Sequence, residues 1–585
     1  MKVSDLVAKI LSNHTNCIFG GQGGSVVHLV DSITKNKKLK FISGQNEQAS
    51  SIAADSYFRT CGKLGVAIGT SGPGIINLLQ GMACSYFDSV PSLYISGAPV
   101  TSQIRKNKNI RQIGFQEMEV VNLVKPITKY AVLIKNKYQI EYEFNKAIEL
   151  AFTARMGPVL IDLPDDIQRQ SIQKKKIFYK KKINNKPNVT NINLSKKISE
   201  TIKLINKAKR PLILVGNGIK FSKSQILLKK FINKTNIPYA CSWAMIDDFN
   251  CSDKMNAGTF GVAATRYGNF AVQNADLLIC FGIRLSPQIV GAKKNAFAPN
   301  AKKILVEIDK YELVSHQLPK IDIKINHDVN IFLKKILIKM IYFNKVKYEK
   351  WIAKINFLKT KYPIVKTQHY LDRRYVNPYA FFNELSKYIK KDTILIPDAS
   401  ANLIWCMQAF KNTKNTKIFT ALNHSPMGYS VPASVGAYFA NKKKKIISII
   451  GDGSMPMNIQ ELETIKNFNV NVIIFIVNNS GYGLIKQTQE TWLKSNFSGV
   501  DKQSGLSLPN NIKIGNAYGI KTVFLKNNQS MIRNLNKILK LKGPVIVDIN
   551  INPKTRVSPK IDSGQPLHEM SPKINKKELD KIMKN

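Results

Sequence analysis

Apolar runs that end in small polar turns constrain the fold of this chain more than any other feature. Two of them lie within residues 446–483, where IISII ends at GDG (451–453) and VNVIIFIV ends at NN (478–479). Comparable runs, each followed by a helical pattern, occur at GVAIGT (65–70) and PLILVGNG (211–218). Continuous apolar strands that alternate with helices indicate parallel sheets covered on both faces. We therefore predict an α/β fold with three doubly wound parallel-sheet domains.

Changes in composition divide the chain into parts. A Lys/Asn-rich stretch at 171–193 reads as a surface linker, and a Lys/Tyr-rich stretch at 340–375 connects the next two parts. The parts share the order strand, small-residue turn, helix, but no short sequence repeat relates them. The predicted parts are domains at 1–170, 194–345 and 376–555, followed by a C-terminal tail at 556–585.

Charge and cysteine content argue against several classes of protein. The formal net charge of +50 comes mostly from lysines spread along the chain, so we interpret it as solvated surface and expect no nucleic-acid partner. A basic nucleic-acid-binding protein is the non-enzyme alternative, which salt-dependent RNA binding without coenzyme binding would favour. No apolar run reaches the roughly 18 residues of a membrane span. The seven scattered cysteines, without a CxxC motif, indicate reduced thiols and a cytoplasmic protein.

The two polar turns at 451–453 and 478–479 predict a metal site. Ligands of open parallel sheets bind beyond the carboxyl ends of the strands, so Asp452 and Asn479 converge if their strands are neighbours. A carboxylate, an amide oxygen and a backbone carbonyl, here assigned to Gly481, are hard ligands that suit Mg²⁺ together with bound phosphates. The sequence therefore predicts a Mg²⁺-diphosphate site.

Small residues around the same turn complete this prediction. Glycines at Gly451 and Gly453 let backbone N–H groups approach a phosphate, and Ser454 follows them. A helix beginning near Met457 and Asn458 would direct its positive end at the diphosphate. GDG alone is usually a simple turn, but GDG at a strand end, 24 residues (454–477) and then NN is a specific combination.

This combination resembles the fingerprint of thiamine diphosphate-dependent enzymes. Residues 41–99, which include TSGPGxxN at 70–77, also resemble the pyrimidine-binding domain of acetolactate synthases, and the likeness extends from about residue 5 to about 570. The resemblance implies that Glu47 hydrogen-bonds N1′ of the aminopyrimidine ring as a catalytic residue, and that Pro73 and Asn77 bind the coenzyme. Without it, Glu47 reads as an ordinary acidic residue at a helix N-terminus.

Three further stretches carry the same resemblance. NHSPMGYSVPASVGAYFA (423–440) implies that Met427 is the apolar wedge under the bent coenzyme, and that the Ser425 carbonyl accepts from its amino group; otherwise Met427 is a core residue. The Phe-Gln-Glu at 115–117 implies that Gln116 is an active-site residue. Asn402 occupies a coenzyme-binding slot in the stretch that precedes Trp405.

The middle segment resembles the FAD-binding domain of the same family, over residues 258–309. The implied FAD-site residues are Gly258, Gly261, Arg284 and Asp309. YACSWAMIDDF (239–249) departs from the usual small-residue run of the family. Without the resemblance, the segment reads as a Rossmann-like spacer domain. The tail at 558–573 resembles the C-terminal tail of the family.

Four departures from the family pattern concern the second substrate. Gly21-Gln22-Gly23-Gly24 replaces Tyr-Pro-Gly-Gly, Asp165 replaces a lysine, Thr488 replaces a tryptophan, and Ala401-Asn402 replaces part of Gln-x-Gln. The residues that bind and activate the coenzyme are retained. We therefore expect donor activation to be intact and acceptor recognition to have changed.

The resemblance implies decarboxylation of a 2-oxoacid, pyruvate first, with carboligation to a second carbonyl compound, as in branched-chain amino acid biosynthesis. The alternatives are transfer of the two-carbon unit to a keto-sugar nucleotide, and simple decarboxylation to an aldehyde. The implied assembly is a homodimer or homotetramer in which Glu47 acts in trans to Asp452, with a regulatory small subunit as a further candidate partner.

Overall fold

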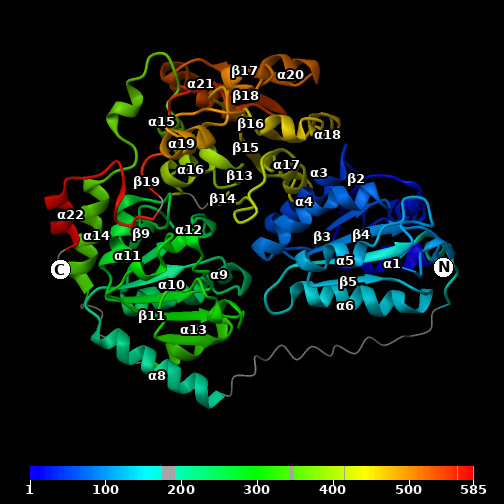
Figure 1. Cartoon of the computed structure of the whole chain (residues 1–585), viewed down its shortest axis with the longest axis horizontal. Helices are drawn as coiled ribbons and strands as arrows, with labels where there is room; N and C mark the ends of the chain where they lie inside the picture. The colour runs from blue at the N-terminus through cyan, green and yellow to red at the C-terminus, as the bar shows by residue number, and fades with distance from the viewer. Residues whose placement is uncertain (108, 174–190, 341–347, 414–415, 563, 584–585) are drawn as a thin grey trace.

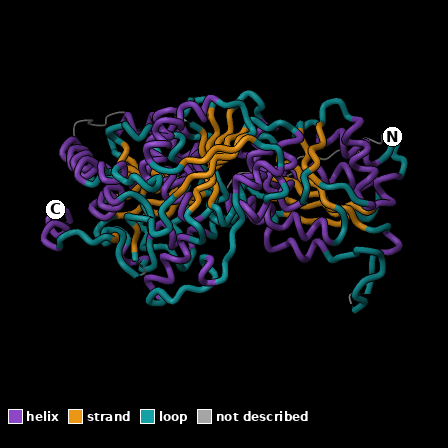
Figure 2. The backbone as a smooth tube through the Cα atoms, turned by 90° about the horizontal axis from the view of Figure 1, so that it is seen from above, coloured by secondary structure: helices purple, strands orange, loops and turns teal. Residues whose placement is uncertain are grey.

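The computed structural model describes residues 1–107, 109–173, 191–340, 348–413, 416–562 and 564–583. Its strands form three six-stranded parallel sheets, one in each successive part of the chain. The strands lie in the interior of each part and the helices lie outside them (Figures 1 and 2). The predicted α/β class with three parallel sheets is confirmed.

The first sheet has the strand order β2-β1-β3-β4-β6-β5. Its strands are β1 (Cys17–Gly20), β2 (Lys40–Ser43), β3 (Gly65–Gly69), β4 (Ser92–Ala98), β5 (Tyr130–Leu133) and β6 (Pro158–Pro164). Its helices are α1 (Val3–Leu11), α2 (Val27–Lys35), α3 (Glu47–Cys61), α4 (Pro73–Asp88), α5 (Val120–Val124), α6 (Ile140–Phe152) and α7 (Asp165–Arg169). Strands β3, β4 and β6 are buried along their whole length, which explains why they read as continuous apolar runs.

The middle sheet has the order β12-β11-β10-β7-β8-β9, which is that of a doubly wound dinucleotide-binding fold. Its strands are β7 (Pro211–Val215), β8 (Tyr239–Cys241), β9 (Asn256–Thr259), β10 (Leu277–Phe281), β11 (Lys302–Glu307) and β12 (Ile323–Asn326). Its helices are α8 (Asn191–Lys207), α9 (Gly218–Phe221), α10 (Gln225–Thr235), α11 (Arg266–Asn274), α12 (Pro287–Val290), α13 (Val329–Lys339) and α14 (Glu349–Lys361). The strand order reverses between β7 and β10, so a ligand is expected at the carboxyl ends of these two strands.

The third sheet has the order β14-β13-β15-β16-β18-β17, which repeats the topology of the first sheet. Its strands are β13 (Thr393–Pro397), β14 (Lys417–Ile418), β15 (Lys445–Gly451), β16 (Val472–Asn478), β17 (Lys521–Leu525) and β18 (Val545–Asn550). Its helices are α15 (Pro378–Tyr388), α16 (Ser400–Ala409), α17 (Ser430–Ala440), α18 (Glu461–Asn467), α19 (Gly483–Trp492), α20 (Asn511–Ala517) and α21 (Asn528–Lys540). The tail adds β19 (Lys560–Ile561), β20 (Met570–Ser571) and α22 (Lys576–Met583).

Two sequence expectations about local structure differ from the structure. The connecting stretch at 340–375 contains α14, whose Trp351 indole donates to the Pro211 carbonyl and so packs the helix on the middle domain. The helix expected to begin near residue 457 begins instead at Glu461, because residues 455–458 form a 3-10 turn. Most of the predicted linker at 171–193 lies outside the described residues.

The first and third domains pack directly on each other through α3 and α17. Small residues allow this close approach: a Cβ on Gly436 would lie 2.0 Å from the Ala53 carbonyl oxygen. Ser56 of α3 donates to the Ala433 carbonyl of α17 at 2.6 Å. One core of buried apolar side chains continues from one sheet to the other. This contact fixes how the two sheet edges are presented.

No helix among the described residues is long and apolar enough to cross a bilayer. All seven cysteines have free thiols.

Candidate active site

The two polar turns of the third domain lie side by side, as predicted. Strands β15 and β16 are neighbours, with Gly451 opposite Val477, so Asp452 and Asn479 leave the same edge of the sheet. Asp452 is 3 % exposed and accepts hydrogen bonds from the backbone N–H groups of Gly453 and Gly481, both at 3.0 Å. The carboxylate is therefore held in a single position.

Asp452, Asn479 and Gly481 converge on one point. One terminal atom of the Asn479 amide lies 3.2 Å from Asp452 Oδ1 and 2.8 Å from the Gly481 carbonyl oxygen. As a nitrogen, this atom donates to both oxygens. As an oxygen, it forms with the Asp452 carboxylate and the Gly481 carbonyl a set of three hard oxygen atoms of the kind that bind Mg²⁺. The described residues contain no cluster of three His, Cys, Asp or Glu side chains, so this mixed set is the candidate metal site.

Burial raises the pKa of the Asp452 carboxyl to about 7, and the backbone N–H groups that bond to it only partly offset this effect. The neighbouring Asp548 carboxyl also contributes to the rise. A buried carboxylate without a cationic partner is unfavourable. A bound cation would relieve this cost, so the chemistry of the donor set fits Mg²⁺.

Asn402 and Ser454 line the same turn. Both are buried, and the Asn402 Oδ1 atom has no hydrogen-bond partner, while its amide nitrogen donates to the Ala399 carbonyl at 2.7 Å. A Cβ on Gly453 would lie 2.3 Å from the Tyr482 ring, so only glycine fits there. An unpartnered buried oxygen beside this turn is an acceptor for a ligand.

Asp398, at the end of β13, is a site residue that the sequence analysis missed. Its carboxylate is buried and accepts from the backbone N–H groups of Gly428 (3.0 Å) and Ser430 (2.9 Å). It therefore fixes the segment that carries Ser425 and Met427, where Met427 is half-buried. An acidic residue directly after the apolar run DTILIP was the available signal.

Asp548 is a second missed residue. It lies on β18 and accepts from the side-chain amides of Asn478 at 3.3 Å and Asn511 at 3.4 Å. Asn478 immediately precedes Asn479, so Asp548 supports the turn that carries a candidate metal ligand. Support of this kind orients metal ligands in proteins.

Glu47 lies at the corresponding edge of the first sheet. The Asn46 side chain caps α3 by accepting from the Gln48 N–H at 2.7 Å, which places Glu47 at the first helical position. The Asn77 amide donates to Glu47 Oε2 at 3.0 Å. A Cβ atom on Gly21 would lie 3.0 Å from Glu47 Oε1, and one on Gly74 would lie 3.3 Å from it. The glycine that departs from the family pattern thus leaves space beside this carboxylate.

Pro73 and Gln116 belong to the same edge. Pro73 begins α4 directly after Gly72, whose Cβ would lie 2.9 Å from the Gln116 carbonyl oxygen. Gln116 itself has a left-handed backbone, with φ of 58°. The structure therefore brings Glu47, Pro73, Asn77 and Gln116 together in the first domain.

Left-handed backbone conformations at non-glycine residues recur around both edges. Gln116, Ser400, Ser425 and Ser480 have φ values of 58°, 70°, 50° and 58°. Each costs of the order of 1–3 kcal/mol and persists only when the surrounding structure enforces it. Such conformations cluster at functional sites. They therefore support the assignment of the site to the carboxyl edges of the first and third sheets.

The carboxylate of Glu47 has its contacts within the first domain, and that of Asp452 has its contacts within the third. A contact between the domains lies close to Glu47: the Glu461 carboxylate accepts from the N–H groups of Gln45 (3.0 Å) and Asn46 (3.1 Å). The third domain therefore supports the turn from which Glu47 projects.

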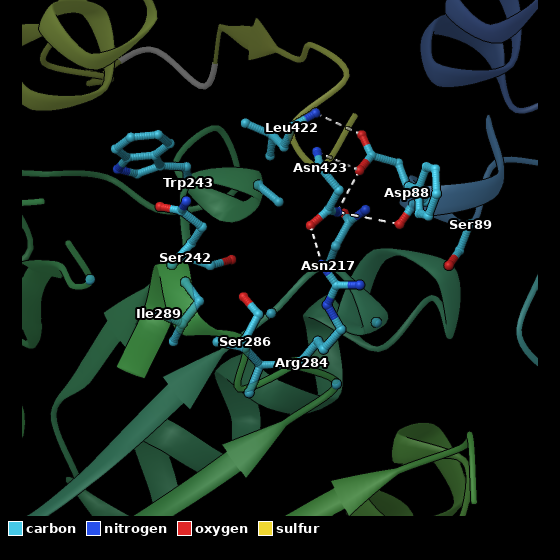
Figure 3. Close-up of a pocket in the computed structure, with 18 of the residues that line it drawn as sticks. Asp88, Ser89, Asn217, Ser242, Trp243, Arg284, Ser286, Ile289, Leu422 and Asn423 are labelled. Carbon is cyan, nitrogen blue, oxygen red and sulfur yellow. Dashed lines mark hydrogen bonds between the residues drawn. The ribbon is translucent and has the colours of Figure 1, made fainter. Parts of the chain in front are cut away.

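A cavity of about 2540 Å³ extends from the third domain across the middle domain. Gly261 and Arg284 line it, and Arg284 Nη2 donates to Asn423 Oδ1 at 2.5 Å (Figure 3). The cavity exceeds the roughly 300–1,000 Å³ of a pocket for a drug-sized ligand, so it has room for an extended dinucleotide. It reaches the carboxyl ends of β7 and β10, where the strand order reverses.

Gly258 and Asp309, the other two residues expected at the FAD site, are not among the residues that line this cavity. A Cβ on Gly258 would lie 2.3 Å from the Tyr267 ring, so this glycine allows close packing. Asp309 forms an ion pair with Arg155 of the first domain at 2.9 Å. Trp243 lines the cavity (Figure 3), and its indole nitrogen is buried without a partner.

The other two departures from the family pattern, Thr488 and Asp165, lie in different parts of the structure. Thr488 lies on α19 and lines the cavity, and its side chain is smaller than the tryptophan expected from the family pattern. Asp165 forms an ion pair with Arg169 at 3.2 Å, and His28 Nε2 lies 3.8 Å from its carboxylate. The negative charge at this position is therefore partly compensated within the first domain.

Comparison with protein families gives three matches along the chain. Residues 1–123 match the model of the thiamine pyrophosphate enzyme N-terminal TPP binding domain, and thiamine pyrophosphate is another name for thiamine diphosphate. Residues 198–336 match the central domain of these enzymes, and residues 398–549 match their C-terminal TPP binding domain.

Curated relatives cover nearly the whole chain. The chain is 31% identical to a probable acetolactate synthase large subunit of Methanococcus aeolicus, over 94% of this chain and 92% of the relative. It is 28% identical to the acetolactate synthase large subunit of Cyanidium caldarium, over 97% and 95%. It is 29% identical to that of Lactococcus lactis subsp. lactis, over 94% and 93%.

Proposed function

Because this chain belongs to the acetolactate synthase large-subunit family and has the domains of thiamine pyrophosphate enzymes, we propose that it is a thiamine diphosphate-dependent carboligase. It decarboxylates a 2-oxoacid, pyruvate first, and joins the remaining two-carbon unit to a second carbonyl compound. The observation that carries this proposal is the convergence of Asp452, Asn479 and Gly481 at the carboxyl edge of a parallel sheet.

The third domain would hold the diphosphate end of the coenzyme. Asp452, Asn479 and the Gly481 carbonyl would bind Mg²⁺, which in turn would hold the phosphates. The turn at 451–454 would supply backbone N–H groups, and the Asn402 oxygen would accept from the coenzyme. When bound, thiamine diphosphate supplies a thiazolium group that accepts the electrons released by decarboxylation.

The first domain would hold the pyrimidine end. Glu47 would share a proton with the ring nitrogen that it faces, and so favour the ring form whose amino nitrogen can take up a proton. The Asn77 amide, which donates to Glu47, keeps this carboxylate oriented. Met427 would pack against the coenzyme, and the Ser425 carbonyl would accept a hydrogen bond from its amino group. Gln116 would border the reacting atoms.

The residues that line the cavity suggest which carbonyl compounds could serve as the second substrate. A second 2-oxoacid as acceptor would make the chain an acetolactate synthase in branched-chain amino acid biosynthesis. Thr488 favours a second candidate, because its side chain on the cavity wall is smaller than the expected tryptophan and would leave room for a larger carbonyl acceptor such as a keto-sugar nucleotide. Simple decarboxylation to an aldehyde is a third outcome of the same chemistry.

FAD is the second cofactor that we propose, in the cavity of the middle domain. The support is the strand-order reversal between β7 and β10, together with Gly261 and Arg284 on the cavity wall. Arg284 would pair with a phosphate of the dinucleotide. Absorbance of the purified protein at the flavin bands tests this assignment.

A homodimer or homotetramer is the assembly that we propose, with Glu47 of one chain acting with Asp452 of another. Large apolar side chains are exposed beside both edges: Ile113 and Phe115 near Gln116, and Met457 and Ile485 near the diphosphate turn. Exposed apolar groups of this kind mark interaction surfaces. The name "large subunit" that the relatives carry supports a regulatory small subunit, and the free cysteines support a cytoplasmic location.

Two measurements test the proposed function. Titration of the metal-supplied protein with thiamine diphosphate should give a calorimetric binding signal, and no heat under these conditions would contradict the proposal. Incubation with ¹³C-pyruvate, alone and with a keto-sugar nucleotide, distinguishes the reactions. Acetolactate supports the first candidate, a branched-chain sugar the second, and free acetaldehyde the third.

A further inference from the structure

A buried ionic network in the first domain bonds to the loop that carries Met427. The network consists of Asp55, Arg59 and Asp88, and the loop, here called the Met427 loop, comprises residues 420–429 of the third domain. Arg59 Nε donates to Asp55 Oδ2 at 2.7 Å, and Arg59 Nη2 donates to Asp88 Oδ2 at 2.9 Å. Asp55 is fully buried and Asp88 is 7 % exposed.

The network bonds to both ends of the Met427 loop. At its beginning, Arg59 Nη1 donates to the Thr420 carbonyl at 2.9 Å. The backbone N–H groups of Leu422 and Asn423 donate to Asp88 at 2.8 and 3.1 Å, and the Asn423 amide also donates to Asp88 (Figure 3). At its end, the buried Tyr429 hydroxyl donates to Asp55 Oδ2 at 2.6 Å. All three charged side chains of the network thus contact this loop.

Anchors within the third domain bond to Thr420 and Gly428 of the same loop; the Thr420 hydroxyl donates to the Asp398 carbonyl at 3.5 Å. Asp398 accepts from the Gly428 N–H, and the Asn458 amide donates to the Gly428 carbonyl at 3.0 Å. Between the two sets of anchors lies Ser425, whose φ of 50° is unfavourable for a residue other than glycine. A strained residue keeps one conformation only if both flanks are fixed. The network, together with the bond from Arg284 of the middle domain to Asn423, fixes the flank that precedes it.

The free energy lost by removing the charges of the network from water indicates that the network has a role beyond packing. Three charges at a domain boundary lose their hydration, and apolar side chains of similar volume often stabilise such a boundary equally well. Burial works against the charge on Arg59, but the acidic groups around it outweigh this effect and hold its pKa well above the ordinary value. Here five hydrogen bonds join the network to main-chain or side-chain atoms of a single loop, one donated by Arg59 and four accepted by the two aspartates.

We propose that Asp55, Arg59 and Asp88 are positioning residues that set the conformation of the Met427 loop, and through it the placement of Ser425 and Met427 against the coenzyme. This inference rests on the proposed function for the identity of the coenzyme. The first domain thereby acts on two sites of the reaction: it carries Glu47, and it shapes a loop of the diphosphate-binding domain in its own chain.

Hydrogen exchange of the metal- and coenzyme-free protein tests the network directly. Asp88→Asn keeps the shape of the side chain but removes the charge that accepts from two loop N–H groups. Hydrogen bonds to charged groups contribute enough that the peptide covering residues 420–430 should exchange about tenfold faster or more. Exchange at the wild-type rate in a folded Asp88→Asn variant would overturn the proposal.

A matched control separates a local effect from general loss of stability. Glu384 on α15 is a buried acid like Asp88 but lies in the third domain, and its partners are Lys387 and Tyr370. Glu384→Gln should leave exchange in residues 420–430 within about twofold of wild type, because these partners lie outside the loop. An equal acceleration in this control would overturn the assignment. If Asp88→Asn does not fold, Tyr429→Phe removes only the hydroxyl that donates to Asp55, and should accelerate exchange about threefold.

A coenzyme measurement completes the test. In Asp88→Asn, the dissociation constant for thiamine diphosphate with Mg²⁺ should change by less than about threefold, because the metal ligands are untouched, whereas kcat should fall about tenfold. Equal losses in affinity and kcat in both Asp88→Asn and Glu384→Gln would contradict a positioning role. If wild-type protein binds no thiamine diphosphate, the proposed function fails, while the exchange result still decides whether the network holds the loop.

Discussion

The first and third domains have the same sheet topology but different chemistry in the corresponding turns. After the strand that is second along the chain, the first domain has Glu47 and the third has the Met427 loop. After the third strand, the first has TSGPG (70–74) and the third has GDGS (451–454). After the fourth, the first has the segment with Gln116 and the third has Asn479 with Gly481. One architecture thus supplies two different half-sites.

This comparison shows where the chemistry of the molecule is determined. The sheets provide equivalent edges, because strand order and direction are the same in both domains. Oxygen atoms able to bind a cation, those of Asp452, Asn479 and Gly481, gather at one edge, and at the other lies the Glu47 carboxylate held by the Asn77 amide. The residues in the turns, rather than the fold, decide which end of the coenzyme each domain can bind.

Replacing the Glu47 carboxylate of the first domain should have the largest effect on catalytic activity. Glu47→Gln keeps the shape of the side chain but removes the proton-sharing group, so kcat should fall by about 10²–10⁴ with little change in thiamine diphosphate affinity. Glu141→Gln, on α6 of the same domain, is the control and should retain wild-type kcat. Steady-state kinetics at saturating coenzyme, with calorimetry, measures both quantities, and a fully active Glu47→Gln variant would refute the role of the first half-site.

Removing the corresponding acid of the third domain should mainly affect binding. Asp452→Ala deletes a candidate ligand, so affinity for thiamine diphosphate in the presence of Mg²⁺ should fall about 100-fold. Asp392→Asn is a suitable control, because this exposed residue precedes β13 at the opposite edge of the same sheet. Isothermal titration with and without Mg²⁺ checks the prediction; unchanged affinity in Asp452→Ala would mean that the metal binds elsewhere.

The cavity wall should separate acceptor choice from donor activation. Thr488→Trp fills space on the wall, so the ratio of product with a small acceptor to product with a large one should rise about tenfold. Decarboxylation of the donor should be preserved, because neither half-site is altered. Product analysis with mixed acceptors measures this ratio, for which Thr491→Ser on the same helix serves as the control. An unchanged ratio would exclude Thr488 from acceptor selection.

Mixed assemblies test whether the two half-sites belong to different chains. Equal amounts of Glu47→Gln and Asp452→Ala chains should form dimers of which half are mixed, each with one intact site, so about a quarter of wild-type activity should return. Each variant alone provides the baseline. Failure to recover activity in verified mixed dimers would place both half-sites in one chain.

The smallest expected effect concerns the pH dependence of stability. It involves one of two buried aspartates that lie at equivalent positions of the two sheets. Asp162 on β6 and Asp548 on β18 lie within the similar segments GPVLIDL (157–163) and GPVIVDI (543–549). Burial raises the pKa of Asp162 to about 7, although the Ser96 hydroxyl donates to it at 2.6 Å. An unfolded aspartate has a pKa of about 3.9, so between these pH values the folded state binds the extra proton.

The stabilising contribution of protonated Asp162 is therefore complete below about pH 4 and is lost as the pH rises to about 7. Asp162→Asn removes this pH dependence of stability. Between pH 5 and 7 the free energy of unfolding should therefore fall less in the variant than in the wild type, by an amount of the order of 1–4 kcal/mol. Thermal unfolding of both proteins at each pH measures the difference. Asp165→Asn is the control, and parallel curves for wild type and Asp162→Asn would contradict the prediction.

Much of the fold and part of the candidate site could be predicted from local sequence. The strands β15 and β16, their adjacency and the edge that carries Asp452 and Asn479 follow from apolar runs that end in small polar residues. The repeated topology of the first and third sheets could not be read in this way, since the segments around Asp162 and Asp548 share only a short pattern. The late start of α18 was also missed, because residues 455–458 form a tighter turn.

The supporting residues of the site were the least predictable. Asp398, Glu461 and Asp88 each look like an ordinary acidic residue in the sequence, and the partners of Asp88 in the Met427 loop lie 334 and 335 positions away. Their role depends on which segments the folded chain brings together.

The sequence by itself determined the elements, the class of sheet and the residues able to bind a cation, because these depend on periodicity and on side-chain chemistry over a few neighbouring positions. Only the tertiary structure decided that Glu47, Asn77 and Gln116 share one edge, and that the Met427 loop is held from another domain. Such contacts arise from packing between distant segments, where burial and chain geometry choose the partners and no local pattern records the choice.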